Sequence, residues 1–252
     1  MPPIDSYVLT ETGTRSHMED RYNLILDNDN GVIIGGIYDG HNGAEVAENA
    51  ARMIPKAVAA NVRDGLNIGD AFRKAFKEAS FEGGHLFIGS TALVFLIKGD
   101  TLIVANTGDC RLLLIHDDRG VQLTTDHRVT NLEECNRLKA SGATIKKNRV
   151  FFGDRGLNIS RALGDLALKE IGITEEPDVG VFKLPPRYTL IAATDGLWAY
   201  LKNHQVGQIA SADLTAEQIC QELIRTVKET SSRYRYLDNT TLIILKKTDD
   251  AN

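Results

Sequence analysis

Apolar runs along the chain predict a series of strands, and apolar residues at helical spacing predict helices between them. The strongest strand signal is Val32–Tyr38, a run rich in β-branched residues that ends abruptly at Asp39-Gly40. The other predicted strands are Tyr7–Thr12, Tyr22–Asp27, Ser90–Ile97, Thr101–Asn106, Arg111–Ile115, Tyr188–Thr194 and Thr240–Leu245. Tight turns at Gly99-Asp100 and Gly108-Asp109 indicate that neighbouring strands form hairpins.

Two amphipathic helices are predicted after the third strand. The apolar stripe of the first runs from Val46 to Val58, and Pro55 within it should kink or restart the helix. The second helix spans about Ile68–Ala79, with its apolar residues on one face.

Two further helices are marked by capping boxes. Thr130 and Glu133 have the spacing of such a box and open a helix that ends near Gly142. Thr215 caps the last helix together with Gln218. The intervening stretch Lys146–Leu157 is interpreted as irregular and locally basic.

Hairpins interrupted by paired helices do not follow the regular alternation of strand and helix that parallel sheets require. The pattern therefore favours an α+β fold over a doubly wound parallel sheet. Because the sequence contains no linker, internal repeat or shift in composition, residues 1–252 are interpreted as one domain.

The charge balance limits the partners that we expect. With a net charge of −5 the chain lacks the basic footprint that nucleic acids or anionic membranes attract. An anionic substrate would need a bound cation to reverse the local sign. Cys110, Cys135 and Cys220 fit neither a disulfide framework nor a clustered zinc site. We therefore expect reduced thiols, no membrane span, and a cytoplasmic or nuclear location.

Acidic residues recur where predicted strands end. Taken singly, each is most simply a turn former. Two of them repeat one pattern, because Ile33–Ile37 leads into Asp39-Gly40 and Leu190–Ala193 leads into Asp195-Gly196. If these strands lie side by side in one sheet, their carboxylates converge and repel unless cations bind. All-oxygen ligands suit Mg²⁺ or Mn²⁺ better than zinc.

Short motifs along almost the whole chain carry a family resemblance. In order, they are Arg15-Ser16-His17-Met18-Glu19-Asp20, Tyr38–Gly43, Gly89–Ala92, Ala105–Arg111, Leu123–His127, Ser160–Asp165, Thr194–Trp198 and Asp238-Asn239. With these motifs the chain resembles the metal-dependent type 2C serine/threonine protein phosphatases, the PPM family. Any one motif is weak, but their shared order makes chance an implausible explanation.

The resemblance implies a central sandwich of two antiparallel β-sheets flanked on both sides by α-helices, with a short flap-like segment around residues 128–157. It also implies a two-metal site at one end of the sandwich. Asp39 would bridge both ions, Asp195 and Asp238 would complete one shell, and Glu19 with the Gly40 carbonyl would complete the other.

The resemblance assigns further roles around these ligands. Asp20 would hold metal-bound water, Arg15 would bind the substrate phosphate, and His41 would act as general acid. Asp109 would help to hold a third, weaker metal. Ala199 stands where the family has an aspartate at that third site. The remaining motif residues, interpreted as structural, are Asp126, His127, Arg161, Asp165 and Trp198.

The implied activity is hydrolysis of phosphoserine and phosphothreonine in proteins, dependent on Mg²⁺ or Mn²⁺, by direct attack of water and without a covalent phosphoenzyme. The expected partners are phosphorylated proteins, and we expect a monomer. One alternative is a catalytically inactive relative that serves as a regulatory binding module. Another is a different two-metal enzyme such as a nuclease, which the absence of a basic groove disfavours. None of the cysteines lies in a phosphate-cradling loop, which argues against a cysteine-dependent phosphatase.

Overall fold

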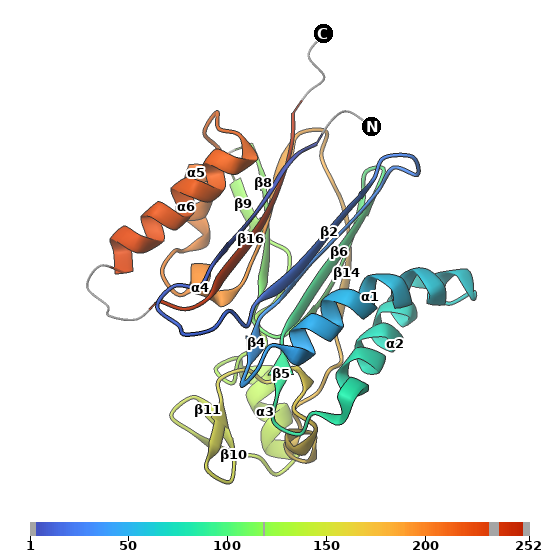
Figure 1. The fold of residues 1–252 in the computed structure, drawn as a ribbon, viewed down its shortest axis with the longest axis vertical. Helices are drawn as coiled ribbons and strands as arrows, with labels where there is room; N and C mark the ends of the chain where they lie inside the picture. The colour runs from blue at the N-terminus through green and yellow to red at the C-terminus, as the bar shows by residue number, and fades with distance from the viewer. Residues whose placement is uncertain (1–3, 118, 232–236, 249–252) are drawn as a thin grey trace.

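The computed structural model describes residues 4–117, 119–231 and 237–248, and two large antiparallel sheets form its centre (Figure 1). The first sheet, here sheet A, has the order β1-β16-β15-β8-β9. Its strands are β1 (Asp5–Glu11), β16 (Thr240–Lys247), β15 (Tyr188–Ala193), β8 (Arg111–His116) and β9 (Arg119–Gln122). The interior strands β15 and β16 are buried almost throughout, as their continuous apolar runs require.

The second large sheet, sheet B, has the order β14-β7-β6-β3-β2. Its strands are β14 (Asp178–Lys183), β7 (Thr101–Thr107), β6 (Ala92–Lys98), β3 (Val32–Tyr38) and β2 (Arg21–Asp27). Apolar side chains of both sheets, including Phe95 and Ile243, fill the space between them. Sheet-on-sheet packing of this kind buries one face of every strand in a common core.

Helices cover the outer faces of the sandwich (Figure 1). The apolar stripes of α1 (Glu45–Arg63) and α2 (Ile68–Phe81) pack on sheet B. On sheet A lie α4 (Asp195–Trp198), α5 (Asn203–Ala210) and α6 (Ala216–Ser231). This four-layer α-β-β-α arrangement confirms the predicted fold class. Within the described residues, no helix is both long and apolar enough to cross a bilayer.

A smaller assembly lies beyond one end of the sandwich, at the bottom of Figure 1. Two short sheets belong to this end, β13-β5-β4 and β10-β11-β12. Their strands are β4 (Gly40–His41), β5 (Gly89–Ser90), β13 (Leu163–Gly164), β10 (Thr144–Lys146), β11 (Arg149–Phe152) and β12 (Arg155–Leu157). The helical segments nearby are α3 (Leu132–Ala140), η1 (Glu82–Gly84) and η2 (Leu166–Ile171). A separate apolar cluster that includes Leu138 and Val150 holds this assembly together.

The interpretation of Lys146–Leu157 as irregular is therefore wrong. Most of this stretch belongs to the three-stranded antiparallel sheet β10-β11-β12, which we call the flap sheet. Its strands are only three or four residues long, too short for an alternation of apolar and polar residues to mark them. Pairing across the sheet and burial of Val150 stabilise strands of low intrinsic signal.

Other local predictions need correction. The cap of α3 is Asn131, whose side chain accepts a 3.0 Å hydrogen bond from the Glu133 amide, and not Thr130. Asn is a strong cap in its own right. Of the two effects predicted for Pro55, a restart does not occur, since α1 is one helix from Glu45 to Arg63 whose buried stripe packs on sheet B. The edge strands β9 and β14 and the helix α5 were not predicted, since partly exposed edge strands carry few apolar residues.

The convergence of Asp39 and Asp195 was predicted on the condition that the strands ending at them lie side by side in one sheet. This condition is wrong, although the two aspartates do converge. β3 lies in sheet B and β15 in sheet A, so these strands do not share a sheet. They face each other across the interior of the sandwich. Asp39 and Asp195 therefore meet because the two sheets pack face to face with both strands ending at the same side.

The packing between the sheets makes a stability prediction. Phe95 is completely buried in the inter-sheet core, so Phe95→Ala should lower the free energy of unfolding by about 3–5 kcal/mol. Urea denaturation measures this loss. Val181→Ala, at a residue of β14 that is 62% exposed, is the matched control and should change the stability by less than about 0.5 kcal/mol. Equal effects of the two substitutions would contradict the packing described here.

Candidate functional site

A cleft of about 680 Å³ is lined by residues from the ends of the two large sheets and from the flap sheet. Strand ends and connecting loops supply its floor, and the flap sheet supplies part of its wall. The predicted site residues that line this cleft are Arg15, Glu19, Asp39, Gly40, His41, Asp109, Asp195 and Asp238. The remaining one, Asp20, is buried beside it. Residues that are up to 223 positions apart thus converge on one cavity.

Asp39 is held at the end of β3 by its own backbone. Its N–H donates to Thr91 Oγ1 over 3.0 Å, and its carbonyl accepts from the Thr91 N–H over 2.9 Å. One carboxylate oxygen from each of Asp39, Asp109 and Asp195 lies within 4.8 Å of the others. These three aspartates form the centre of the cleft.

Arg128 is a cation that the sequence analysis did not single out. Its Nη2 lies 2.8 Å from Asp109 Oδ2 and 3.1 Å from Asp195 Oδ2. The guanidinium therefore bridges two of the three central carboxylates. Arg128 follows the Asp126-His127 motif by one position, but only the folded chain brings it to Asp109.

The N-terminal loop reaches the cleft through contacts with the segment before β16. The Glu19 N–H donates to Asn239 Oδ1 over 2.8 Å, and the Asn239 side chain donates to the carbonyls of Thr12 and His17. Arg15 forms a two-bond pair with Asp238, with Nε and Nη2 each 2.9 Å from a carboxylate oxygen. The two segments thus position each other.

Gly40 permits the close approach of this loop. A Cβ atom at Gly40 would lie 2.6 Å from the Glu19 carbonyl oxygen, which is too short for a non-bonded contact. Any side chain at this position would push Glu19 away from Asp39. The glycine of the Asp-Gly turn therefore has a packing role at the site itself.

Asp20 lies behind the cleft floor. Its Oδ2 accepts a 3.0 Å hydrogen bond from Thr194 Oγ1, which in turn accepts from the Thr241 N–H over 2.9 Å. Its Oδ1 is buried and has no hydrogen-bond partner among the described residues. A buried carboxylate oxygen without a partner is costly, so a water or cation is needed to satisfy it.

Burial and mutual repulsion raise the pKa values of the clustered carboxyl groups. Desolvation raises the pKa of Asp20 and of Asp109 from about 3.8 to about 7, and neighbouring carboxylates add to both shifts. The pKa of Asp39 lies well above its ordinary value, first through desolvation and then through Asp20, Asp195 and Asp109. Desolvation also raises the pKa of Asp195, although Arg128 opposes this shift.

These observations fit a site for hard divalent cations. The donors are oxygen atoms, they converge within one cleft, and their negative charges are unfavourable unless positive charge is brought in. Oxygen donors of this kind match Mg²⁺ and Mn²⁺. Arg128 supplies only part of the balancing charge, on the side of Asp109 and Asp195.

His41 has a buried acidic partner that sequence reasoning missed. Its Nε2 lies 2.6 Å from Oδ2 of Asp165, whose side chain is 2% exposed. Gly89 leaves room for this pair, since a Cβ there would lie 2.1 Å from Asp165 Oδ2 and 2.5 Å from His41 Nε2. Asp165 was interpreted as structural, and the 124 positions that separate it from His41 leave no local pattern that connects the two.

The other motif residues interpreted as structural have structural partners. Arg111 forms a two-bond pair with Asp126, and Arg161 pairs with Glu134 and Asp178. The Gly108 amide donates to His127 Nδ1 over 3.1 Å, which fixes the turn before Asp109.

Comparison of the sequence with family models identifies the protein family. The model for "Protein phosphatase 2C" matches residues 5–237. The chain belongs to the protein phosphatase 2C family. It is 34% identical over 222 residues to probable protein phosphatase 2C 2 of Arabidopsis thaliana, a match that covers 82% of this chain. It is 31% identical over 214 residues to protein phosphatase 1L of Bos taurus, covering 77% of this chain.

Solved structures agree with the fold of this protein phosphatase 2C chain. A serine-threonine phosphatase 2C from Toxoplasma gondii superimposes with a TM-score of 0.84 at 23% identity, over 98% of both chains.

The sequence matches to the two relatives span 57% of the Arabidopsis protein and 59% of the bovine protein. The chain therefore corresponds to little more than half the length of these two relatives.

The raised pKa values predict how stability depends on pH. In the unfolded chain aspartates lose their protons near pH 4, whereas Asp20 and Asp109 retain theirs in the folded state up to about pH 7. The folded state therefore binds more protons between these values, and the free energy of unfolding should fall as the pH rises from 4 to 7. Thermal melts in EDTA across this range measure the fall.

Asp20→Asn, which removes one of these carboxyl groups, should flatten the curve, and Asp213→Asn at an exposed position should not. Added Mn²⁺ should raise the melting temperature more at pH 8 than at pH 5, because protons compete with the ion. A melting temperature that does not change with pH in EDTA would contradict the assignment.

Proposed function

We propose that this chain is a metal-dependent phosphatase that hydrolyses phosphoserine and phosphothreonine in proteins, with water as the direct nucleophile. The observation that carries the proposal is the convergence of Asp39, Asp109 and Asp195 within 4.8 Å in the cleft of a protein phosphatase 2C chain. Glu19 and Asp238 line the same cleft. Carboxylates clustered in this way attract cations, and they repel an anionic substrate unless cations are bound.

The proposed ligands of two Mg²⁺ or Mn²⁺ ions are the side chains of Glu19, Asp39, Asp195 and Asp238 and the carbonyl of Gly40. When bound, two such ions supply Lewis acidity and a water acidic enough to ionise near neutral pH. Asp39 is suited to a central position because its N–H and its carbonyl both form hydrogen bonds with Thr91, which fix its backbone. The unpartnered Oδ1 of Asp20 is suited to accept a hydrogen bond from ordered water.

Arg15 is the proposed phosphate ligand. Its guanidinium offers a planar pair of donors that matches two phosphate oxygens. In this structure both donors bind the Asp238 carboxylate. A substrate phosphate would compete with Asp238 for these two donors. Both side chains are partly exposed to the cleft, at 42% and 34%, so the exchange needs no unfolding.

His41 is the proposed general acid, because the alkoxide that leaves from serine or threonine is strongly basic. With Nε2 directed at Asp165, Nδ1 is the ring nitrogen left to carry the transferable proton. Asp165 is a positioning residue, since its contact with Nε2 fixes the orientation of the ring.

Asp109 was predicted to bind a third ion, and that role stays a prediction. Arg128 already pairs with its carboxylate, and Ala199 offers no ligand atom. We propose a cytoplasmic or nuclear monomer that acts on phosphorylated proteins. The alternative is a regulatory binding module without turnover, and the following experiment separates the two.

Turnover of a phosphothreonine peptide with Mn²⁺ should be abolished by EDTA. Asp39→Asn and Asp195→Asn should each lower kcat/KM by about 10²-fold or more, because each removes a proposed ligand. Asp213→Asn, at an exposed position, is the matched control and should retain full activity. Isothermal titration with Mn²⁺ should report weaker binding in both site variants.

Two results would overturn the proposal. Activity that survives EDTA, or that is equal in all variants, would exclude a metal-dependent mechanism at this cleft. Tight Mn²⁺ binding by the unaltered chain without turnover of any phosphopeptide would favour the binding-module alternative.

The roles of His41 and Asp165 predict a dependence on the leaving group. In the variant Asp165→Asn the side chain keeps its size. Asparagine also tolerates the left-handed backbone at this position, where φ is +47°. Its kcat for a phosphothreonine peptide should fall by about tenfold or more. Hydrolysis of p-nitrophenyl phosphate should change less than threefold, because nitrophenolate leaves without a proton. Equal losses on both substrates would indicate a structural role instead.

A further inference from the structure

The part of the cleft lined by the flap sheet is cationic. Lys147, Arg149 and Arg155 come from the flap sheet and line the same cleft as Asp39, Asp195 and Asp238. Lys146 precedes them, and Asp154 is the one acidic residue between Thr144 and Leu157. In a chain of net charge −5 this concentration of positive charge stands out, and it corrects the expectation from the sequence that no basic groove is present. We call Lys147, Arg149 and Arg155 the basic rim.

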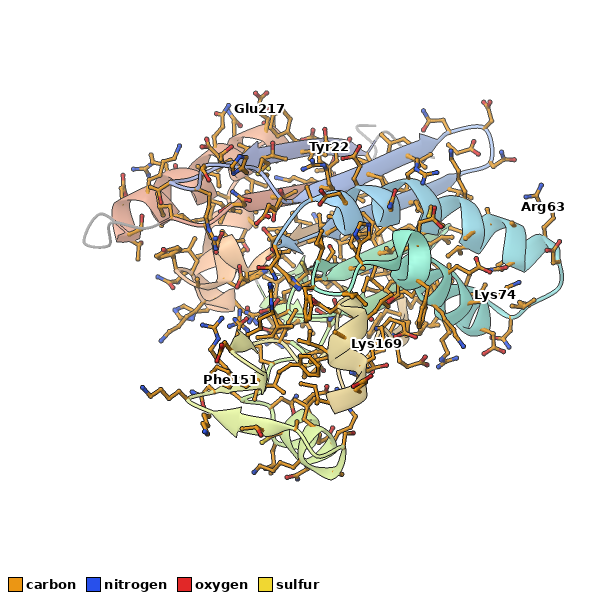
Figure 2. The ribbon with its side chains drawn as sticks, turned by 60° about the horizontal axis from the view of Figure 1, so that its bottom comes forward. Tyr22, Arg63, Lys74, Phe151, Lys169 and Glu217 are labelled. Carbon is orange, nitrogen blue, oxygen red and sulfur yellow. The ribbon has the colours of Figure 1, made fainter. Side chains whose placement is uncertain are left out.

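The flap sheet holds the basic rim in a defined arrangement. Lys147 and Asn148 form the turn between β10 and β11, with φ values of +48° and +60°, and Lys146 pairs with Arg149 across it. This geometry is that of a tight hairpin turn. Figure 2 labels Phe151 on this small sheet, which projects away from the two large sheets. Lys147 therefore stands at the tip of a projecting hairpin.

Two of the three cations have fixed side chains. Arg149 donates from Nη2 to the Gly156 carbonyl over 2.7 Å. The Arg155 guanidinium lies over the Phe87 ring, 4.5 Å from its centroid, and a cation–π contact of this kind is favourable. Val150, completely buried, anchors β11 between them. Because these two side chains are already held in place, binding an anion costs less side-chain entropy than it would with flexible side chains.

The basic rim has no acidic partner in the part of the chain that the structure describes. Within 4.0 Å, no ion pair involves Lys147, Arg149 or Arg155. Other arginines that line or adjoin the cleft are paired, as Arg128 is with Asp109 and Arg15 with Asp238. Three like charges grouped without counter-ions repel one another, and they attract an anion that enters the cleft.

We propose that the basic rim binds acidic residues of the substrate polypeptide next to its phosphorylated residue, so that the enzyme prefers phosphosites flanked by aspartate or glutamate. The inference rests on the proposed function, which places the phosphate at the carboxylate end of the cleft. An extended peptide advances about 3.3–3.6 Å per residue, so side chains a few residues from the phosphate can contact other residues that line the same cleft. The guanidinium groups of Arg149 and Arg155 match carboxylates in shape as well as charge.

The test compares two phosphothreonine peptides of equal length, one with glutamates and one with glutamines within three residues of the phosphothreonine. The glutamates are placed first on the N-terminal side and then on the C-terminal side. The unaltered chain should show kcat/KM about threefold to tenfold higher for one acidic peptide, as expected for a few partly exposed ion pairs. The preference should shrink between 50 and 500 mM NaCl.

The triple variant Lys147→Gln, Arg149→Gln, Arg155→Gln should bring the ratio of acidic to neutral peptide close to one. The matched control is Lys56→Gln, Lys74→Gln, Lys77→Gln, which removes the same charge from exposed positions of α1 and α2. Figure 2 labels Lys74 on α2, far from Phe151 on the flap sheet. The control should keep the preference of the unaltered chain.

Fluorescence anisotropy of the same peptides, labelled, measures binding independently of turnover. Turnover without any preference, or equal losses for both peptides in the triple variant, would overturn the role of the basic rim and leave the proposed function standing. Binding that favours the acidic peptide without turnover would support the basic rim and overturn the proposed function.

Discussion

Repulsion among carboxylates that share a cleft is the constraint on which this structure depends. Asp39, Asp109 and Asp195 lie within 4.8 Å of one another, and the pKa values of all three are raised by loss of water and by neighbouring charges. A fold holds such a group together only by spending stability gained elsewhere. The four-layer sandwich supplies that stability, because three separate apolar clusters hold its two sheets and outer helices together.

The protein offsets part of this repulsion with its own cations. Arg128 forms ion pairs with Asp109 and Asp195, and Arg15 donates two hydrogen bonds to Asp238. Neither arginine belongs to one of the named strands, although Arg128 forms an isolated β-bridge with Ile159. These ion pairs balance only part of the negative charge, because Asp39 pairs with neither arginine.

Sequence patterns predicted the buried part of this architecture better than its periphery. The central strands β3 and β15 carry long apolar runs, and the structure places strands at both. The Asp-Gly turns that end them marked the cleft correctly, although the two strands belong to different sheets. Face-to-face packing of two sheets leaves no periodic signal in either strand, so this relation was not accessible from the sequence.

The features that sequence reasoning missed are contacts between distant and individually unremarkable residues. Asp165 pairs with His41 across 124 positions, and Arg128 contacts Asp195 across 67. The flap sheet was missed for a different reason. Its strands are too short to give a pattern, and they are stabilised by pairing with each other and by a shared apolar cluster with α3. The ligand and catalytic roles assigned from the family resemblance remain predictions.

The link between Glu19 and Asn239 has a consequence for how the protein matures. The loop that carries Glu19 is tied to residues just before β16, and β1 pairs in sheet A with β16 alone. During synthesis β1 therefore has no strand partner in sheet A until β16 has been made. Until β16 docks, the acidic centre lacks both Asp238 and the anchor of Glu19. This centre therefore forms only when the segments that carry β1 and β16 are both available.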